Sequence, residues 1–352
     1  MVEWKKLGDV CEVLDSQRKP VSKRKRLQGD YPYYGANGIQ DYVDNYIFDG
    51  IFLLMGEDGS VINKDNSPVL HWATGKIWVN NHAHILRENN QALLRYLFYI
   101  LQCTNVSDIV RGVPPKINQA NMRNIDLPIP SLSEQTRIVG ILDTFTASIE
   151  NLKEQIAQRR KQYEHYRDEL LDLEGKPGVE MKTLPEISDN RDRVRKPITS
   201  SKRKAGNYPY YGASGIVDYV AGYIFDGDYL LISEDGANLV ARSTPIAFSI
   251  TGKNWVNNHA HVLQFKDKAT QKYVEIYLNM IDLEPWINGA AQPKLNQDNL
   301  NKISIPLPPL SEQQRIVSIL DTFEASIQNL EAQLKEREKQ YEYYRNKLLT
   351  FE

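Results

Sequence analysis

Apolar residues recur at alternating steps of four and three along two long stretches of the chain, Ile138 to Leu170 and Ile316 to Leu348. The seam positions between these ends are Leu142, Phe145, Ile149, Leu152, Ile156, Arg159, Tyr163 and Tyr166 in the first stretch, and Leu320, Phe323, Ile327, Leu330, Leu334, Arg337, Tyr341 and Tyr344 in the second. Such a heptad seam predicts two long helices that pair as a coiled coil. Helices of about 40 residues would each be about 60 Å long at 1.5 Å per residue.

Local signals bound these helices. Ser131 with Glu134, and Ser311 with Gln314, have the spacing of a capping box and predict the two helix starts. Gly175-Lys176-Pro177-Gly178 predicts the end of the first helix and a linker. Arg159 and Arg337 occupy seam positions, where an arginine either fixes the register of the pair or extends its charge to water while the coil frays.

The segments outside the helices form two heads. Short runs of aromatic and branched residues, such as Tyr46-Ile47-Phe48 before Asp49-Gly50, predict strands joined by turns. One helix is predicted in each head, over Gln91–Leu101 and over Gln271–Ile281. The expected fold class is therefore α/β, with two mixed and mostly sheet-containing heads joined by the two long helices.

The chain is a duplication of one module. Tyr31-Pro32-Tyr33-Tyr34-Gly35-Ala36 recurs at 208–213, and Trp78-Val79-Asn80-Asn81-His82-Ala83-His84 recurs at 255–261. The expected domains are a first head at 1–129, a long helix at 130–174, a linker at 175–179, a second head at 180–307 and a second long helix at 308–352. Internal pseudo-two-fold symmetry favours antiparallel pairing of the helices within one chain, and a homodimer through the helices is the alternative.

The cysteines and the apolar runs of the chain exclude several classes of protein. The 352 residues carry a formal net charge of −2 and two cysteines, Cys11 and Cys103, which correspond to Ser188 and Met280 in the second copy. A disulfide or metal site common to both modules is therefore excluded. No apolar run reaches the roughly 18 residues of a membrane span, and the N-terminus lacks the apolar core of a signal peptide, so we expect a cytoplasmic protein without membrane contact.

Basic residues are concentrated in one segment of each head. The segment from Arg18 to Arg26 carries six basic residues and no acidic one, and the segment from Arg191 to Lys204 carries seven against Asp192. Such segments on a neutral protein are typical of phosphate contact, although a solvated mobile loop has the same composition. The predicted phosphate contacts are Arg18, Lys19, Lys23, Arg24, Lys25 and Arg26, then Arg195, Lys196, Lys202, Arg203 and Lys204.

Amide side chains are the candidates for base contact. Asn80 and Asn81, with Asn257 and Asn258 in the second copy, could read base edges or could close a turn. A proline loop carries Lys116, Asn118 and Gln119, repeated as Lys294, Asn296 and Gln297, and predicts further phosphate and base contacts. The run Tyr33-Tyr34-Gly35-Ala36-Asn37-Gly38 is expected to be a tight turn anchored by buried tyrosines, with contact to a sugar-phosphate backbone as the alternative.

Motifs for catalysis are missing. The chain has no phosphate-binding loop of the G-x-x-x-x-G-K-[ST] kind, no G-x-S-x-G run and no H-E-x-x-H pair. His82 and His84, with Glu57 and Asp58, could bind a metal ion, and His259, His261, Glu234 and Asp235 repeat them. Their apolar strand context favours hydrogen-bonded structural histidines, so no metal is predicted.

The ordered, duplicated motifs resemble the specificity (S) subunit of type I restriction–modification systems. The resemblance rests on the Tyr-Pro-Tyr-Tyr-Gly-Ala run and on Leu-Pro-Ile-Pro-Ser-Leu-Ser-Glu-Gln at 127–135, repeated as Ile-Pro-Leu-Pro-Pro-Leu-Ser-Glu-Gln at 305–313. It covers essentially the whole chain. An adenine methyltransferase's Asn-Pro-Pro-aromatic run is absent, which agrees with a non-catalytic chain.

The resemblance implies a function. Each head would be a target-recognition domain that binds one half of a bipartite site in double-stranded DNA. The paired helices would be a spacer and a docking surface for two methyltransferase subunits, with restriction motor subunits in a larger complex. No cofactor is expected on this chain, and S-adenosylmethionine is expected on the partner methyltransferase. Alternative hypotheses are a stand-alone metal-dependent nuclease and a purely structural coiled-coil adaptor.

The two copies differ where base recognition is expected. Residues 60–65, Ser-Val-Ile-Asn-Lys-Asp, correspond to 237–242, Ala-Asn-Leu-Val-Ala-Arg. Val113-Pro114-Pro115 corresponds to the longer run Ala290-Ala291-Gln292-Pro293. We therefore expect half-sites that are related, with some bases shared in inverted orientation, without being identical.

Overall fold

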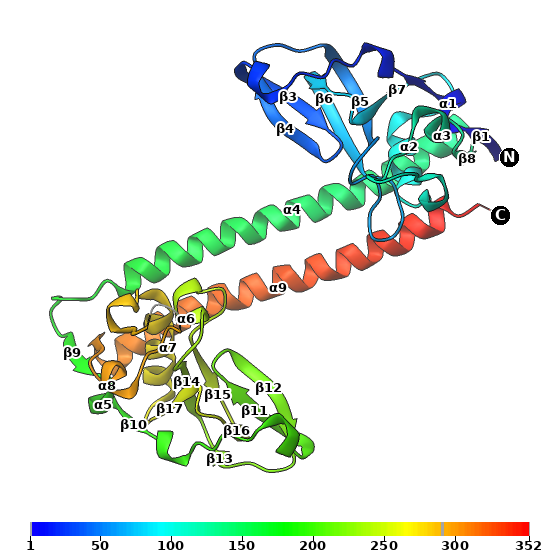
Figure 1. The fold of residues 1–352 in the computed structure, drawn as a ribbon. Helices are drawn as coiled ribbons and strands as arrows, with labels where there is room; N and C mark the ends of the chain where they lie inside the picture. Colours follow the sequence, from blue (N-terminus) through cyan, green and yellow to red (C-terminus); the bar gives the residue numbers. More distant parts are fainter. Residues whose placement is uncertain (1, 290–291, 352) are drawn as a thin grey trace. The chain divides into compact units, whose positions relative to one another are not determined.

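A computed structural model, which describes residues 2–289 and 292–351, divides the chain into two compact units (Figure 1). Unit 1 comprises Met1–Glu154 and Glu331–Glu352, and unit 2 comprises Gln155–Leu330. Each unit therefore contains one head together with the beginning of one long helix and the end of the other. Every helix of the described residues is too short or too polar to cross a lipid bilayer.

The head of unit 1 is built on a six-stranded sheet of order β2-β7-β5-β6-β3-β4, and β1 pairs with β8 beside it. All neighbours are antiparallel except β3 and β6, which run parallel. The elements are β1 Glu3–Lys6, α1 Leu7–Val10, β2 Cys11–Val13, β3 Gln28–Gly35, β4 Gly38–Val43, β5 Phe48–Gly56, β6 Leu70–Val79, β7 Ala83–Glu88, α2 Leu94–Leu101, α3 Gln119–Arg123 and β8 Asp126–Ile129.

The head of unit 2 repeats this order with shorter strands. Its strands form two four-stranded sheets, β10-β17-β14-β15 and β12-β11-β16-β13, because the counterparts of β5 and β6 are each divided in two. The elements are β9 Glu180–Thr183, α5 Leu184–Ile187, β10 Ser188–Asn190, β11 Ala205–Gly212, β12 Gly215–Val220, β13 Phe225–Asp226, β14 Tyr229–Ser233, α6 Asn238–Ala241, β15 Ala247–Ile250, β16 Lys253–Val256, β17 Ala260–Phe265, α7 Lys268–Met280, α8 Gln297–Leu300 and β18 Ser304–Leu307.

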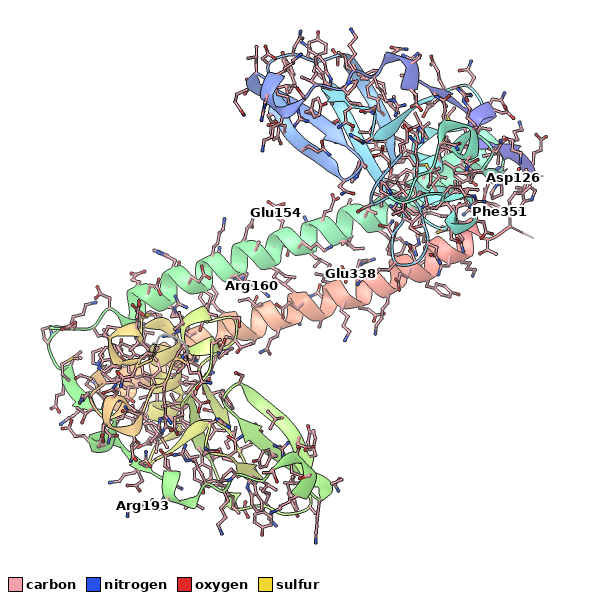
Figure 2. The ribbon with its side chains drawn as sticks, viewed as in Figure 1. Asp126, Glu154, Arg160, Arg193, Glu338 and Phe351 are labelled. Atoms are coloured by element: carbon pink, nitrogen blue, oxygen red, sulfur yellow. The ribbon has the colours of Figure 1, made fainter. Side chains whose placement is uncertain are left out.

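The predicted long helices are α4, Leu132–Leu171, and α9, Leu310–Leu349. In unit 1, Phe145 of α4 stacks on Tyr344 of α9, with ring centroids 5.3 Å apart. Further along α4, Lys153 lies 3.4 Å from Glu338, labelled in Figure 2, which precedes Tyr344 in α9. The two helices of unit 1 therefore run antiparallel, as predicted.

Unit 2 pairs the other ends of the same helices. Tyr166 of α4 stacks on Phe323 of α9 at 5.4 Å, and the Tyr163 hydroxyl donates to Glu324 at 3.3 Å. The α/β fold class, with two sheet-containing heads and two long helices packed together in one chain, is confirmed.

The two seam arginines adopt an arrangement that the heptad pattern did not predict. Arg337 lies over the ring of Phe145 in unit 1, 5.6 Å from its centroid. Arg159 lies over the ring of Phe323 in unit 2, at 5.7 Å. Each guanidinium thus stays in the seam and makes a cation–π contact with the other helix.

The start of α4 agrees with the capping prediction, whereas the start of α9 does not. Ser131 precedes α4, and its hydroxyl accepts the Glu134 N–H at 3.4 Å. In the second copy Pro309 occupies the equivalent position, and its carbonyl accepts the Glu312 N–H at 2.9 Å. Ser311 lies inside the first turn of α9, so its predicted capping role is wrong: the helix begins at Leu310, two residues before the start that a cap at Ser311 would give.

The glutamine of each Leu-Ser-Glu-Gln run attaches a long helix to its head. Gln135 is buried, donates to the Pro130 carbonyl at 2.9 Å and accepts the Leu93 N–H at 2.8 Å. Gln313 is buried as well, and donates to the Pro308 carbonyl at 2.7 Å. Apolar residues of each helix start, such as Ile138 and Ile316, belong to the core of the adjacent head, so helix and head share one core.

The helices predicted inside the heads are present with shifted ends. The first, α2, begins at Leu94, three residues later than predicted, because Leu93 before it is extended and donates its N–H to Gln135. The second, α7, begins at Lys268 and ends at Met280.

Candidate nucleic-acid interface

Four segments of unit 1 that are far apart in sequence meet beside the ends of β5 and β6. They are residues 15–26, 57–60, 80–83 and 111–119, and we call them the four-loop surface of unit 1. Backbone hydrogen bonds join three of them: Glu57 N–H to the His82 carbonyl at 2.8 Å, Gly59 N–H to Pro115 at 2.9 Å, and Ile117 N–H to Glu57 at 2.8 Å.

Unit 2 contains the equivalent four-loop surface, formed by residues 192–203, 234–237, 257–260, 288–289 and 292–297. Glu234 N–H donates to the His259 carbonyl at 2.9 Å, and Leu295 N–H donates to the Glu234 carbonyl at 2.8 Å. Ala290 and Ala291, which the sequence comparison singled out, lie outside the described residues.

A buried cluster of charged residues lies under the four-loop surface of unit 1. His84 on β7 places Nδ1 2.6 Å from Asp15 Oδ2 and Nε2 2.8 Å from the Ile117 carbonyl. Arg18 donates to Glu57 Oε2 at 2.6 Å and to the Ala83 carbonyl at 2.7 Å. Because each of the four segments contributes at least one group, the cluster ties the whole surface together.

Both nitrogens of His84 face oxygen acceptors. A neutral imidazole carries one N–H, so only the doubly protonated ring satisfies both contacts. The side chain of His84 has no exposed surface, and Asp15 supplies the compensating negative charge at 3% exposure. A buried charge that is paired and hydrogen-bonded in this way is a structural element of the fold.

The same cluster recurs in unit 2. His261 Nδ1 lies 2.6 Å from Asp192 Oδ2, and its Nε2 lies 2.8 Å from the Leu295 carbonyl. Arg195 donates to Glu234 at 2.6 Å and to the Ala260 carbonyl at 2.8 Å.

The cluster lowers the pKa of its carboxyl groups. Burial alone would raise the pKa of Asp15, but the hydrogen bond and charge of His84, together with the Ile85 N–H and the charge of Arg18, hold this pKa below its usual value. Burial opposes the shift at Glu57 too, and the hydrogen bond from Arg18 contributes most to lowering its pKa. Asp192 and Glu234 are shifted in the same direction for the same reasons.

These shifts predict loss of stability in acid. In the folded state the four carboxyl groups bind fewer protons than in the unfolded chain. Their contribution to the free energy of unfolding is therefore complete above their unfolded pKa values of about 4. It is lost as the pH falls through the lower pKa values of the folded state. We expect the urea midpoint of unfolding to fall steeply below about pH 4. Asp15→Asn should flatten this dependence for unit 1, and an unchanged dependence would contradict the assignment.

The cluster also contains a possible set of metal ligands. Ligand atoms of Asp15, Glu57 and His84 lie within 4.8 Å of one another, as do those of Asp192, Glu234 and His261. In unit 1, however, Arg18 contacts both carboxylates and Lys116 Nζ lies 3.0 Å from Glu57. Protein cations therefore stand where a metal ion would, and both histidine nitrogens are already engaged.

The basic segment of unit 1 is held firmly against the head. The Trp78 indole donates to the Lys19 carbonyl at 2.6 Å, and the Val21 N–H donates to the Tyr33 hydroxyl at 2.9 Å. Arg26 lies 4.1 Å from the Tyr33 ring centroid and pairs with Asp41 at 3.1 Å. The segment is therefore an ordered part of the surface, and the buried Tyr33 has the structural role that its sequence context favoured.

Several predicted DNA contacts have hydrogen-bond or ion-pair partners within the protein. Arg18 and Arg26, with their counterparts Arg195 and Arg203, use their guanidinium groups in the ion pairs of the heads. Four of the asparagines predicted to contact bases have local roles. Asn80 and Asn257 close turns by accepting the N–H of residues 82 and 259. Asn118 and Asn296 cap α3 and α8. Gln119 donates to Asp15 at 3.0 Å. We assign these residues a structural role.

The other predicted contacts are exposed on the four-loop surfaces or beside them. They are Lys19, Lys23, Arg24, Lys25, Asn81 and Lys116 in unit 1, and Lys196, Lys202, Lys204, Asn258, Lys294 and Gln297 in unit 2. Arg193, labelled in Figure 2, is an additional exposed cation of unit 2 that was not among the predicted contacts. Its place within the basic segment was the signal that could have identified it.

Known proteins that are similar in sequence to this chain carry the same kind of description. A family model described as the type I restriction modification DNA specificity domain matches residues 1–159 and 177–338. A putative type I restriction enzyme specificity subunit of Haemophilus influenzae is 34% identical, with 99% of this chain and 96% of the relative covered. The specificity subunit of the Escherichia coli type I enzymes EcoR124I and EcoR124II is 31% identical, with 99% and 94% covered.

A similar fold is found among solved structures. The crystal structure of the S subunit of a type I restriction-modification system from M. genitalium superimposes with a TM-score of 0.71 at 15% sequence identity. The alignment covers 100% of this chain and 97% of the other.

Proposed function

Because the chain belongs to the family of type I restriction–modification DNA specificity subunits, we propose that each head binds one half of a bipartite DNA site through its four-loop surface. The chain is the DNA specificity subunit of such a system, and catalysis resides in other subunits of the complex. The proposal that each head binds one half-site rests on one observation. Two equivalent four-loop surfaces occur in one chain, each with exposed cations on an ordered framework.

The chemistry of these surfaces fits DNA. Lys19 and Lys25 in unit 1 correspond to Lys196 and Lys202 in unit 2, and all four are exposed. Cations at equivalent places suit phosphates, which are the same in every sequence, while the divergent loops at 60–65 and 237–242 suit bases. We further propose that the paired helices act as the spacer between half-sites and as the docking surface for two methyltransferase subunits, with restriction subunits joining them.

Methylome sequencing of cells that express this chain with its methyltransferase tests the proposal. The expected result is one bipartite motif whose two halves are related and lie a constant distance apart. Exchange of residues 60–65 for 237–242 should alter one half of that motif and leave the other half unchanged. A single continuous motif, or two wholly unrelated half-sites, would contradict the proposal.

Loss of the paired lysines should weaken binding to every DNA sequence. In the complex with methyltransferase subunits, Lys19→Ala with Lys25→Ala is expected to reduce affinity uniformly, and to lower the slope of log affinity against log salt by about 2, one per phosphate contact. Lys196→Ala with Lys202→Ala should act equally. Lys266→Ala is the matched control, because this exposed lysine follows the opposite end of β17. A changed sequence preference with an unchanged salt slope would exclude phosphate contact.

A further inference from the structure

An exposed histidine–aspartate pair occupies the same place in both four-loop surfaces. His82 Nδ1 lies 2.6 Å from Asp58 Oδ1, and the two side chains are 47% and 26% exposed. His259 Nδ1 lies 2.9 Å from each carboxylate oxygen of Asp235, with exposures of 51% and 32%. These pairs are separate from the buried histidines of the clusters beneath them.

The aspartate determines which ring nitrogen is available. A nitrogen that faces a carboxylate carries a proton, so Asp58 holds Nδ1–H of His82 and directs Nε2, across the ring, away from itself. Neither Nε2 of His82 nor that of His259 has a hydrogen-bond partner among the residues that the structure describes. Each ring therefore presents an oriented nitrogen to a group outside the protein.

The turn that carries His82 does not depend on its imidazole. The backbone N–H of residue 82 donates to Asn80 Oδ1 at 2.8 Å, and its carbonyl accepts the Glu57 N–H at 2.8 Å. These contacts use backbone atoms that any residue would supply. An ion pair as exposed as this one also contributes little to stability. The fold therefore gives no reason for a histidine at this position.

The pair is retained although an adjacent loop has diverged. In unit 1 the segment after Asp58 is an irregular loop closed by a bridge between Ile62 and Pro68. In unit 2 the corresponding segment contains the helix α6. A side chain that is the same in both surfaces, beside loops that differ, suits a feature of DNA that is the same at both half-sites.

A cation lies next to each pair. Lys116 forms a backbone bridge with Asp58 and is 47% exposed, and Lys294 forms the same bridge with Asp235 and is 50% exposed. Each ammonium pairs with a glutamate, Lys116 with Glu57 at 3.0 Å and Lys294 with Glu234 at 3.2 Å, and each adds positive charge near the histidine–aspartate pair. The sequence-independent anion of DNA is the backbone phosphate.

We propose that His82 and His259, each as an imidazolium held between its aspartate and the DNA, donate Nε2–H to one backbone phosphate at the equivalent place in the two half-sites, with Lys116 and Lys294 nearby. The contact adds affinity at a position that is the same in every sequence and reads no base itself, while the divergent neighbouring loops meet the bases. The proposal rests on the proposed function and adds a specific ligand, one phosphate per half-site.

Phosphate-by-phosphate replacement with neutral methylphosphonates tests this contact in the complex with methyltransferase subunits. We expect His82→Ala to lower affinity for site DNA about tenfold, the size of one lost charge-assisted hydrogen bond, without changing the methylated motif. In the unaltered complex one methylphosphonate in each half-site should give a similar loss. His82→Ala should abolish that sensitivity in one half-site only, and His259→Ala in the other only.

Two controls separate the alternatives. His82→Gln keeps an N–H donor and should restore part of the affinity, while the thermal unfolding of all variants should match that of the unaltered chain. Unchanged affinity of His82→Ala, a persistent methylphosphonate sensitivity, or an altered base in the methylated motif would overturn the phosphate contact while leaving the proposed function intact. Absence of any bipartite motif with the unaltered chain would instead refute the proposed function itself.

Discussion

Replacing Asp15 by alanine is expected to lower the free energy of unfolding of unit 1 by about 3 to 5 kcal/mol, the cost of leaving a buried charge without its partner. Asp15 accepts from His84, Gln119 and the Ile85 N–H, and its side chain is 3% exposed. Its removal leaves His84 and Arg18 as neighbouring cations that share only Glu57. The four-loop surface of unit 1 should lose its order before the rest of the head.

Hydrogen exchange of the intact chain measures this result by region. Amides of residues 57–60, 80–83 and 111–119 should lose protection in Asp15→Ala, while unit 2 stays unchanged. Asp192→Ala should produce the converse pattern, because His261 depends on it in the same way. Glu12→Ala is the control: its pair with Arg87 is about half exposed, so its loss should cost less than about 1 kcal/mol. Equal costs for Asp15→Ala and Glu12→Ala would show that the buried cluster does not hold the surface together.

Lengthening α4 and α9 together by one helical turn is expected to widen the gap between the half-sites by one to two base pairs. One turn adds about 5.4 Å, and each base pair occupies about 3.4 Å of the DNA axis. The insertions belong after Lys153 in α4 and before Glu338 in α9, because these residues face each other in unit 1. Methylome mapping of the altered chain with its methyltransferase gives the gap directly.

A second pair of insertions makes the test quantitative. Adding one heptad to each helix at the same places keeps the seam in phase and should widen the gap by about three base pairs, since seven residues add about 10.5 Å. An insertion in α4 alone cannot keep both the Phe145–Tyr344 contact of unit 1 and the Tyr166–Phe323 contact of unit 2 in register, and should impair methylation. A methylated motif with an unchanged gap in both paired insertions would refute the spacer role.

The long helices were predictable because their information is local and periodic. A seam such as Ile138, Leu142 and Phe145 is visible in the sequence, since the helical repeat places these residues on one face whatever surrounds them. The start of α9 was misplaced for the opposite reason. The Ser311–Gln314 spacing matched a capping box by chance, while Pro309 had replaced the serine that precedes α4.

The site was predictable only in part. Two duplicated basic segments indicated the candidate surfaces, but their composition could not distinguish Lys19, which is exposed, from Arg18, which pairs with a glutamate 39 residues away. Likewise, Asn80 and Asn81 are adjacent and chemically identical, yet the first is buried in the turn and the second is exposed. His82 and His84 also differ in role, one paired at the surface and the other buried in a cluster.

The sequence by itself determined the duplication, the mixed heads, the heptad seam and the family resemblance, because each is written in repeats or short-range spacings. Only the tertiary structure decided which polar residues are engaged within the protein and which are exposed at its surface. That division depends on hydrogen bonds between residues far apart in the chain, such as Asp15 with His84 across 69 positions, and no local pattern encodes such a pairing.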